Sequence, residues 1–362
     1  MGVQSTERID VATWGGAVAR IRALTNTATG ALGAVCARAL RGRPAGVLVL
    51  ALLLTACGSS GPSASNPSKL TVGLVGANTA DWPIFLAESQ GYFKQNGIQV
   101  QEVITGGPSQ SAQQLASGSL DVASNGTDSW IRAVSQHLPA KIIAPEFTTD
   151  PYALVTQPSI TSWSQLKGKT VMLGTTTDVT AITFQAMASA QGLSQKDFTV
   201  VTAGSTNSRY AALKSGHVDA AMLTQPFDLL SESEGLHLMA TAKQYVPNWI
   251  FTSLGANTNW LKSHQTEAVG FLKAIEQAIN FGYAHPDTAV SVMAQRSKVS
   301  KPEVQKAYDV DFNQWQAFSK SLSIKPSDLQ AVVQAVVKQG TVKQAPSTSD
   351  LYDGSYVQRA SS

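Results

Sequence analysis

Two nine-residue stretches of the sequence follow one pattern. LASGSLDVA occupies residues 115–123, LKSGHVDAA occupies residues 213–221, and both fit Leu-x-Ser-Gly-x-[Leu/Val]-Asp-x-Ala. Glycine after a helical stretch is typical of a helix C-cap, because it adopts the left-handed conformation without strain. The apolar residues that follow indicate a strand. Each copy is therefore expected to be a helix end, a glycine cap and the strand that follows, with Asp121 and Asp219 at the buried end of the strand in a structural role. Function is expected just beyond the copies, at 125–128 and 224–228.

The N-terminal region contains an apolar run, VLVLALLLTA, over residues 47–56. At about ten residues it is shorter than the roughly twenty that cross a bilayer, and it has the length of the apolar part of a signal peptide. Its end, Leu54-Thr55-Ala56-Cys57, resembles the lipobox of bacterial lipoproteins. We therefore expect residues 1–56 to be a signal peptide and Cys57 to carry the lipid. An ordinary signal peptide with an incidental cysteine is the alternative.

Charge and cysteine usage exclude several classes of protein. Six of the 27 basic and two of the 24 acidic side chains lie in residues 1–56, which leaves 21 against 22 and a net charge of −1. No basic stripe remains for a nucleic acid partner. Cys36 lies in the predicted signal peptide, so Cys57 alone cannot support a disulfide framework. The five histidines lack metal-ligand spacing, and we expect no metal and no cofactor.

Apolar β-branched runs alternate with helical patterns along the chain, which predicts βα units and a mainly parallel sheet in each lobe. The expected segments are the lipidated cysteine with a flexible linker (57–68), the first part of lobe 1 (69–148), lobe 2 (149–250), the return segment of lobe 1 with C-terminal helices (251–342) and a mobile tail (343–362). In open α/β sheets a ligand lies beyond the carboxyl ends of the strands. We therefore expect the site in the cleft between the lobes, which would close by hinge motion.

Five motifs occur in a specific order. They are FLAESQGYFKQNGIQVQ (85–101), LASGSLDVA, SQLKGKTVMLG (164–174), LKSGHVDAAMLTQP (213–226) and AHPDTAV (284–290). Together they resemble the solute-binding proteins of ABC importers for nitrate, taurine and aliphatic sulfonates, and for thiamine-pyrimidine precursors. One departure is Gln165, where the family usually has Asp before Leu-Lys-Gly-Lys. The resemblance covers about residues 69–300.

This resemblance implies a type II periplasmic-binding-protein fold with a ligand cleft between its lobes. It also implies a function outside the cytoplasm, namely capture of a small solute and its delivery to a permease that a cytoplasmic ATPase drives. A lipid on Cys57 would hold the protein at the membrane, close to that permease. We expect the protein to act as a monomer.

The same resemblance places ligand contacts in loops that follow the strands of both lobes. The expected ligand-binding residues are Asp81, Trp82, Gly107, Ser109, Asn125, Thr127, Thr175, Thr176, Thr177, Asn207, Gln225 and Trp249. Helix N-termini in these loops offer backbone N–H groups and partial positive charge, which suit a sulfonate, nitrate or carboxylate. The alternative for each single hydroxyl is that it only caps its own helix.

Two further alternatives remain open at this stage. Four acidic residues fall in these loops with Arg209 as the nearby basic residue, and with neighbouring aromatic side chains they favour an amine or pyrimidine ligand. The acids are Asp81, Asp128, Asp178 and Asp228. The other open interpretation is an extracytoplasmic sensor or enzyme on the same fold. The sequence contains no Gly-x-Ser-x-Gly, His-Glu-x-x-His or nucleotide-binding glycine motif, so we expect no enzyme.

Overall fold

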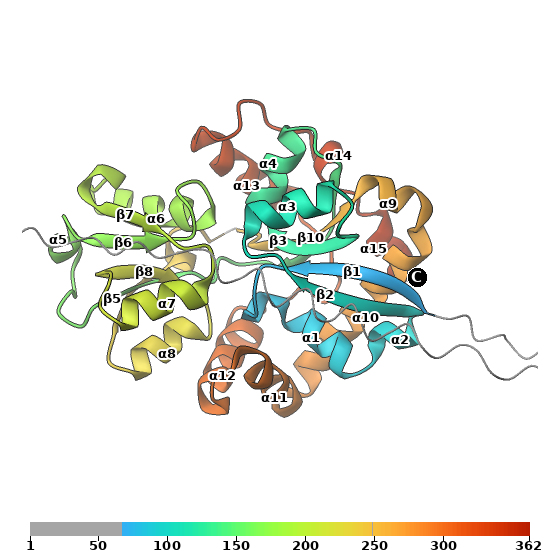
Figure 1. Cartoon of the computed structure of the whole chain (residues 1–362), viewed down its shortest axis with the longest axis horizontal. Coiled ribbons are helices and arrows are strands. Elements are labelled where there is room, and N and C mark those ends of the chain that lie inside the picture. Colours follow the sequence, from blue (N-terminus) through green and yellow to red (C-terminus); the bar gives the residue numbers. More distant parts are fainter. Residues whose placement is uncertain (1–66, 248) are drawn as a thin grey trace, which may run out of the picture. The chain divides into compact units, whose positions relative to one another are not determined.

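The computed structural model describes residues 67–247 and 249–362, so the predicted signal peptide and Cys57 lie outside the described residues. Lobe 1 is built on a five-stranded sheet with the order β2-β1-β3-β10-β4 (Figure 1). Its strands are β1 (Ser68–Leu74), β2 (Ile98–Ile104), β3 (Val122–Gly126), β4 (Ala140–Phe147) and β10 (Thr252–Asn257). β10 enters this sheet only after the chain has built the whole of lobe 2.

Helices from both ends of the described chain cover the sheet of lobe 1 (Figure 1). The early helices are α1 (Trp82–Ser89), α2 (Tyr92–Gln95), α3 (Pro108–Ala116) and α4 (Thr127–Ser135). The later helices are α9 (Thr258–Ser263), α10 (Gln265–Ala284), α11 (Pro286–Ser297), α12 (Lys301–Tyr308) and α13 (Pro326–Lys338), with a π-helical turn over Asp309–Gln314. α10 packs against α1, and its buried apolar residues lie at helical spacing, among them Phe271, Leu272 and Ile275.

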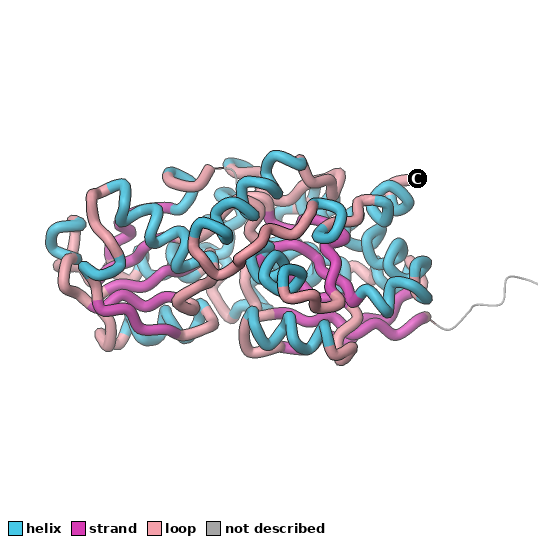
Figure 2. Tube along the Cα trace, turned by 90° about the horizontal axis from the view of Figure 1, so that it is seen from above, coloured by secondary structure: helices cyan, strands magenta, loops and turns pink. Residues whose placement is uncertain are grey.

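Lobe 2 is a second five-stranded sheet, with the order β7-β6-β8-β5-β9. Its strands are β5 (Ala153–Thr156), β6 (Thr170–Leu173), β7 (Thr199–Thr202), β8 (Ala220–Leu223) and β9 (His237–Thr241). Its helices are α5 (Trp163–Leu166), α6 (Val179–Ala190), α7 (Thr206–Lys214) and α8 (Phe227–Ser233). Figure 2 shows the strands of the two lobes as separate groups, each with helices around it.

Each sheet is mixed but mainly parallel, because only one of its strands runs against the others, so the predicted fold class is confirmed. β1 runs parallel to β2 and β3, and β6 runs parallel to β7 and β8. β10 is antiparallel to both of its neighbours, and so is β5. These two strands are the first that the chain forms after it passes from one lobe to the other, so no crossover helix brings them back in the parallel direction.

The repeated phrase occupies equivalent places in the two lobes. In each copy the helix, α3 or α7, ends at the phrase, and the glycine, Gly118 or Gly216, has a positive φ of 78° or 74°. The Asp121 carboxylate accepts the N–H of Thr71 in β1, and the Asp219 carboxylate accepts the N–H of Thr170 in β6, both at 2.8 Å. The predicted structural role of the two aspartates is therefore confirmed.

A side-chain amide completes this arrangement in both lobes. Asn257, at the end of β10, donates to the carbonyl of Leu115 at 2.7 Å. Gln157, directly after β5, donates to the carbonyl of Leu213 at 2.6 Å. Leu115 and Leu213 are the first residues of the two copies. The end of each antiparallel strand thus gives a second hydrogen bond to a carbonyl in the last turn of the helix beside it, which already accepts the N–H of Gly118 or Gly216.

The segment 343–362, expected as a mobile tail, is folded in the structure. It forms α14 (Thr348–Leu351) and α15 (Ser355–Ala360), and α15 packs against α10 and β4. Leu351, Tyr356 and Val357 are buried. The expectation rested on the small number of apolar residues in the segment. Those few residues lie in α14 and α15, where their side chains are buried against the rest of the protein.

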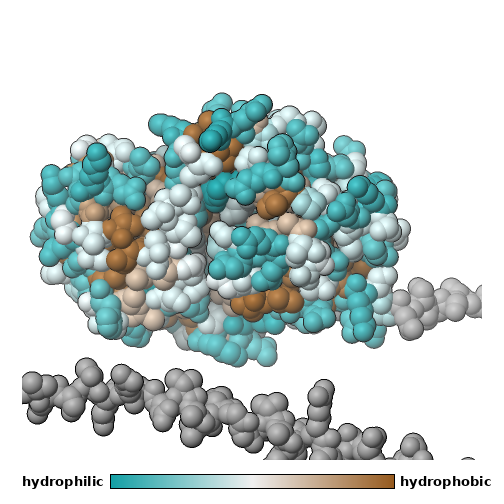
Figure 3. Space-filling model, turned by 45° about the horizontal axis from the view of Figure 1, so that its top comes forward, coloured by the Kyte–Doolittle hydropathy of each residue, from teal (hydrophilic) through white to brown (hydrophobic). Residues whose placement is uncertain are grey.

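The surface drawn in Figure 3 is mostly hydrophilic or neutral, and its apolar patches are small and separate. Among the described residues, Ile104 at the end of β2 is a large apolar side chain that is mostly exposed to solvent, at 63%. No helix in the described ranges is both long and apolar enough to span a membrane.

Candidate functional site

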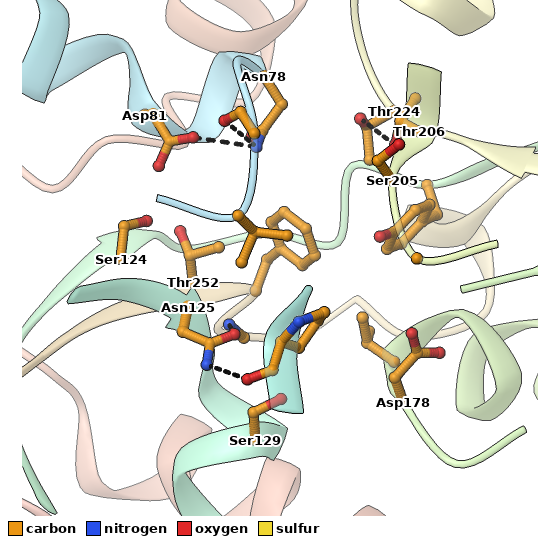
Figure 4. Close-up of a pocket in the computed structure, with 18 of the residues that line it drawn as sticks. Asn78, Asp81, Ser124, Asn125, Ser129, Asp178, Ser205, Thr206, Thr224 and Thr252 are labelled. Atoms are coloured by element: carbon orange, nitrogen blue, oxygen red, sulfur yellow. Dashed lines mark hydrogen bonds between the residues drawn. The ribbon is translucent and has the colours of Figure 1, made fainter. Parts of the chain in front are cut away.

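A cavity of about 70 Å³ lies between the two lobes (Figure 4). One buried water molecule needs about 10–15 Å³ of such space, so the cavity has room for about five waters or one small solute. Lobe 1 contributes the loop after β1, the end of β3 and the start of β10. Lobe 2 contributes the starts of β5, α6 and α7 and the residue after β8. The wall is therefore formed by strand ends from both sheets.

Four helices begin at the cavity wall, because each parallel strand ends there and leads into a helix. They are α3, α4, α6 and α7, represented in the lining by Pro108, Ser129, Val179 and Thr206. The N-caps of α3 and α4 are glycines that provide no capping side chain. The N-termini of helices carry partial positive charge and unpaired N–H groups. At α3 and α4, where no side chain caps the helix, this partial charge suits an oxygen anion, whereas α6 and α7 are capped by the side chains of Asp178 and Ser205.

Arg209 adds a fixed positive charge to the wall of lobe 2. Its side chain is only 1% exposed, and the guanidinium donates to the carbonyls of Met222, Ala203 and Gly204 and to the hydroxyl of Thr206. Among residues 67–247 and 249–362, no carboxylate forms an ion pair with it. A buried guanidinium held by neutral acceptors keeps its full charge, because arginine stays protonated in proteins.

The three carboxyls in the lining differ in their environment. Burial raises the pKa of Asp81 to about 7 and also raises the pKa of Asp178. Asp178 caps α6 by accepting the N–H of Thr180 at 3.0 Å. Asp128 is paired with Arg132, one helical turn further along α4. Much of the acidic charge at the cavity is therefore either protonated near neutral pH or neutralised by a partner.

Three of the twelve expected ligand-binding residues line the cavity: Asp81, Asn125 and Asn207. For these three, contact with a solute stays a prediction. The other nine lie outside the lining, and they are Trp82, Gly107, Ser109, Thr127, Thr175, Thr176, Thr177, Gln225 and Trp249.

The two tryptophans are part of the packed interior. The indole N–H of Trp82 donates to the carbonyl of Ala289 at 2.8 Å, and its ring meets Tyr308 and Phe312 edge to face. Trp249 is also buried, in the segment that leads back to lobe 1. We expected these rings to contact a ligand, but both are buried in the protein interior and neither lines the cavity.

The expected hydroxyl contacts mostly bond within the protein. The Thr127 hydroxyl lies 2.6 Å from that of Ser253. The Thr175 hydroxyl accepts the N–H groups of Thr177 and Asp178, and so it closes its own turn. Thr176 and Ser109 are exposed. Thr177 also contributes to a contact between the lobes, because its carbonyl accepts a hydrogen bond of 2.9 Å from Arg132.

Several lining residues were not predicted from the sequence. Tyr152, Phe251 and Thr252 come at the start of β5 or β10, the antiparallel strands. The rule that ligands bind at the carboxyl ends of strands applies to parallel strands. It therefore does not predict residues at the amino ends of antiparallel strands. Ser124 carried a usable signal, since it directly follows the first copy of the repeated phrase, and Thr224 belongs to the loop 224–228 that was expected at the cleft.

In the described part of the chain, no group of three or more His, Cys, Asp or Glu side chains is arranged to hold a metal ion. The cavity is lined by hydroxyl, amide and carboxyl groups, one guanidinium, the rings of Tyr152 and Phe251, and the apolar side chains of Val75, Ala77, Pro108 and Val179. Such a wall can bind a small polar solute by hydrogen bonds and charge.

The fold and the cavity between two mixed-sheet lobes define a periplasmic-binding-protein fold. A solved structure of the same fold is the alkanesulfonate-binding protein SsuA from Xanthomonas axonopodis pv. citri bound to MOPS, with a TM-score of 0.66 and 15% identity over 80% of this chain and 99% of that one. Another is the ligand-binding component of an ABC-type import system from Staphylococcus aureus with zinc bound, with a TM-score of 0.69 and 16% identity over 81% and 99%.

The chain belongs to the NMT1/THI5-like family, whose model matches residues 78–289, more than half of the chain. One relative is YtlA of Bacillus subtilis (strain 168), named as a candidate binding protein, with 27% identity over 202 residues, 54% of this chain and 60% of that protein. A second is a 4-amino-5-hydroxymethyl-2-methylpyrimidine phosphate synthase of Uromyces fabae, with 25% identity over 221 residues, 56% and 63%. The chain thus spans somewhat less than two thirds of these relatives' own lengths.

Proposed function

We propose that the protein is the extracytoplasmic solute-binding component of an ABC importer, which captures one small solute between its lobes and delivers it to a permease. The observation that carries this proposal is the composition of the cavity wall, to which both lobes contribute polar groups. A solute in the cavity would therefore bridge the lobes and favour their closed arrangement. Two proteins of the same fold support this assignment, one described as the ligand-binding component of an ABC-type import system and the other as an alkanesulfonate-binding protein.

Hinge closure would use the two segments that join the lobes. The first follows β4, and the second precedes β10. They lie beside each other, since the N–H of Phe251 donates to the carbonyl of Phe147 at 2.8 Å and the rings of Tyr152 and Phe251 meet edge to face. Paired segments of this kind let one lobe rotate against the other without disturbing either sheet.

The solute in this proposal carries an oxygen anion such as a sulfonate, nitrate or carboxylate. Arg209 and the N-termini of α3 and α4 supply the positive groups of the cavity, and the hydroxyls of Thr206 and Thr224, 3.2 Å apart, supply polar hydrogen-bonding groups. Hydrogen bonds from charged or helix-terminal donors to anions are stronger than those between neutral groups. A pyrimidine ring is the second candidate, supported by the rings of Tyr152 and Phe251 in the lining.

We also propose that the protein binds its solute without changing it. One relative is named as a synthase, so the family includes an enzyme. The cavity lining of this chain, as far as the structure describes it, contains no histidine, cysteine or lysine to act as base or nucleophile. Recovery of an altered solute after incubation with the protein would contradict this part of the proposal.

Isothermal titration calorimetry on the full chain tests the binding proposal. The probes are propane-1-sulfonate, nitrate, butanoate and a 4-aminopyrimidine. We expect at least one oxygen anion to bind, and Arg209→Gln to weaken that binding by about tenfold or more, as the loss of a charged donor does. Arg359→Gln, a change in an exposed arginine on α15, is the matched control and should bind as the wild type does. If none of the probes binds, the proposal fails.

The membrane anchor is a separate part of the proposal. Cys57 lies outside the described residues, and its assignment rests on the lipobox-like sequence before it. Metabolic labelling with palmitate should mark the wild type and leave Cys57→Ala unlabelled. Equal labelling of both proteins would show that Cys57 does not carry the lipid, and the proposed solute-binding role would not be affected.

A further inference from the structure

Tyr152 lines the cavity, and its side-chain hydroxyl has no hydrogen-bond partner among the described residues. The residue is only 8% exposed, and its hydroxyl is not among the side-chain oxygens that are fully enclosed without a partner. The hydroxyl therefore reaches open space, and the cavity is the space that Tyr152 borders. Buried polar groups are almost always paired in folded proteins, so an unpartnered hydroxyl at a cavity indicates a group that binds a ligand.

The main chain and the ring of Tyr152 are both held in place. Its backbone N–H donates to the Asp150 carboxylate at 2.9 Å, and its carbonyl accepts the N–H of Ala242 at 2.7 Å. The ring meets that of Phe251 edge to face, with 5.4 Å between the ring centres, and the guanidinium carbon of Arg209 lies 5.6 Å from the centre of the Tyr152 ring. Tyr152 and Phe251 belong to the two segments that join the lobes. The hydroxyl is thus presented from the hinge in one fixed position.

Arg209 offers a second donor beside this ring. A guanidinium has five N–H groups. Four of them have acceptors, which are the carbonyls of Met222, Ala203 and Gly204 and the hydroxyl of Thr206. Within the described residues, one N–H on Nη2 is left without an acceptor, and Arg209 lines the cavity. Figure 4 shows Thr206, the acceptor of the other Nη2 hydrogen bond, on the wall that lobe 2 contributes.

The surroundings of the phenol keep it protonated. Burial raises the pKa of Tyr152, and the charge of Arg209 opposes this increase. The nearby carboxyls of Asp128, Asp150 and Asp178 raise the pKa further. An ordinary tyrosine already keeps its proton up to about pH 10. The hydroxyl is therefore a donor at neutral pH, and the group that it can bind is an acceptor oxygen or nitrogen.

We propose that the Tyr152 hydroxyl is a specificity-determining donor, which binds an oxygen of the anionic group of the solute together with the remaining N–H of Arg209. One donor comes from the hinge and the other from lobe 2. A solute of the same shape without an acceptor would leave both donors buried and unpaired, which costs binding free energy. This inference rests on the proposed function and adds to it the residue that would select an oxygen anion.

The test is isothermal titration calorimetry on the full chain, with propane-1-sulfonate, nitrate, butanoate and a 4-aminopyrimidine as probes. Tyr152→Phe removes the hydroxyl and keeps the ring that contacts Arg209 and Phe251. We expect it to weaken binding of the preferred oxygen anion by about tenfold or more, as the loss of a hydrogen bond to a charged group does. Without solute, its urea unfolding midpoint should equal that of the wild type, because the hydroxyl has no partner in the protein to lose.

Tyr308→Phe is the matched control. Tyr308 is buried and lies outside the cavity lining, and its hydroxyl donates to the carbonyl of Gly282 at 2.8 Å. This variant should unfold at a lower urea concentration than the wild type and bind the anion with unchanged affinity. The two tyrosine variants are thus expected to show opposite patterns, one losing affinity and the other losing stability.

Three outcomes would overturn the inference. If Tyr152→Phe binds the anion as tightly as the wild type does, the hydroxyl does not contact the solute, and the proposed function still stands. If Tyr152→Phe lowers the urea midpoint as much as Tyr308→Phe does, the hydroxyl has a structural role instead. If the wild type binds none of the four probes, both the inference and the proposed function fail.

Discussion

At the scale of single residues, the two aspartates of the repeated phrase each hold a helix end to a neighbouring strand. The Asp219 carboxylate accepts the N–H of Thr170, and the N–H of Asp219 donates to the carbonyl of the same residue at 3.0 Å. We predict that Asp219→Ala lowers the free energy of unfolding by about 1.5–3 kcal/mol, the range for a hydrogen bond to a charged group. Urea unfolding measures this loss, and solute affinity should not change.

Asp219→Asn is the matched variant for this prediction. It keeps an oxygen that can accept the N–H of Thr170 but carries no charge, so it should lose clearly less stability than Asp219→Ala. Equal losses in the two variants would mean that the hydrogen bond is not the source of the effect. Asp121 makes the same bond to Thr71 in lobe 1 and provides an independent repeat of the experiment.

The sequence predicted only some of the residues that line the cavity, and the position of each residue in its strand explains why. Asp81, Asn125 and Asn207 follow strands whose carboxyl ends could be located from hydrophobic patterns, and all three line the cavity. Thr252 could not be found in this way, because it begins a strand whose antiparallel direction depends on the path of the chain between lobes.

At the scale of elements, the insertion of β10 depends on close packing against α4. Gly255 lies in the middle of β10, and a Cβ atom added there would come within 2.5 Å of the Trp130 ring. Trp130 is fully buried, and its indole N–H donates to the carbonyl of Ser253 at 2.9 Å, so the ring has no room to move aside. The strand and the helix are thus fitted to each other at this one position.

We predict that Gly255→Ala lowers the free energy of unfolding by about 1–3 kcal/mol, the usual cost of an extra methyl group in a packed core. The control is Gly76→Ala, because Gly76 has a negative or extended φ and no atom within 4 Å of the added Cβ. That variant should unfold at the urea concentration of the wild type or slightly above it. A destabilised Gly76→Ala with an unaffected Gly255→Ala would contradict the packing described for β10.

The order of the elements was more predictable than their pairing. Strand and helix patterns, with the repeated phrase, identified two α/β lobes and the return of the chain to the first. The one antiparallel strand in each mainly parallel sheet was not identified, because its direction is set by connections far apart in sequence: β10 pairs with β3 more than a hundred residues after it. The packed α15 was missed for a related reason, since its burial depends on a groove formed by α10 and β4.

At the scale of the whole molecule, the junction between the lobes contains a buried carboxyl. Asp150 lies in the first connecting segment, accepts the N–H of Tyr152 at 2.9 Å and accepts the hydroxyl of Thr183 in α6. Burial raises its pKa to about 7, and these hydrogen bonds offset the increase only in part. The protonated form of Asp150 is therefore the one that the folded protein favours.

This raised pKa predicts a definite pH dependence of stability. The folded state holds the Asp150 proton more tightly than the unfolded state, in which the pKa is about 3.9. The unfolded state therefore binds fewer protons between about pH 4 and pH 7, and the contribution of Asp150 to stability falls as pH rises through that window and is constant above it.

Asp150→Asn has no carboxyl to ionise, and the Thr183 hydroxyl can rotate to suit the amide. The stability of Asp150→Asn relative to the wild type should therefore increase from pH 4 to pH 8, by up to about 4 kcal/mol for a shift of this size. Urea unfolding of the two proteins at a series of pH values gives the difference directly, and a difference that stays constant or decreases with pH would show that the junction carries an ionised Asp150 throughout.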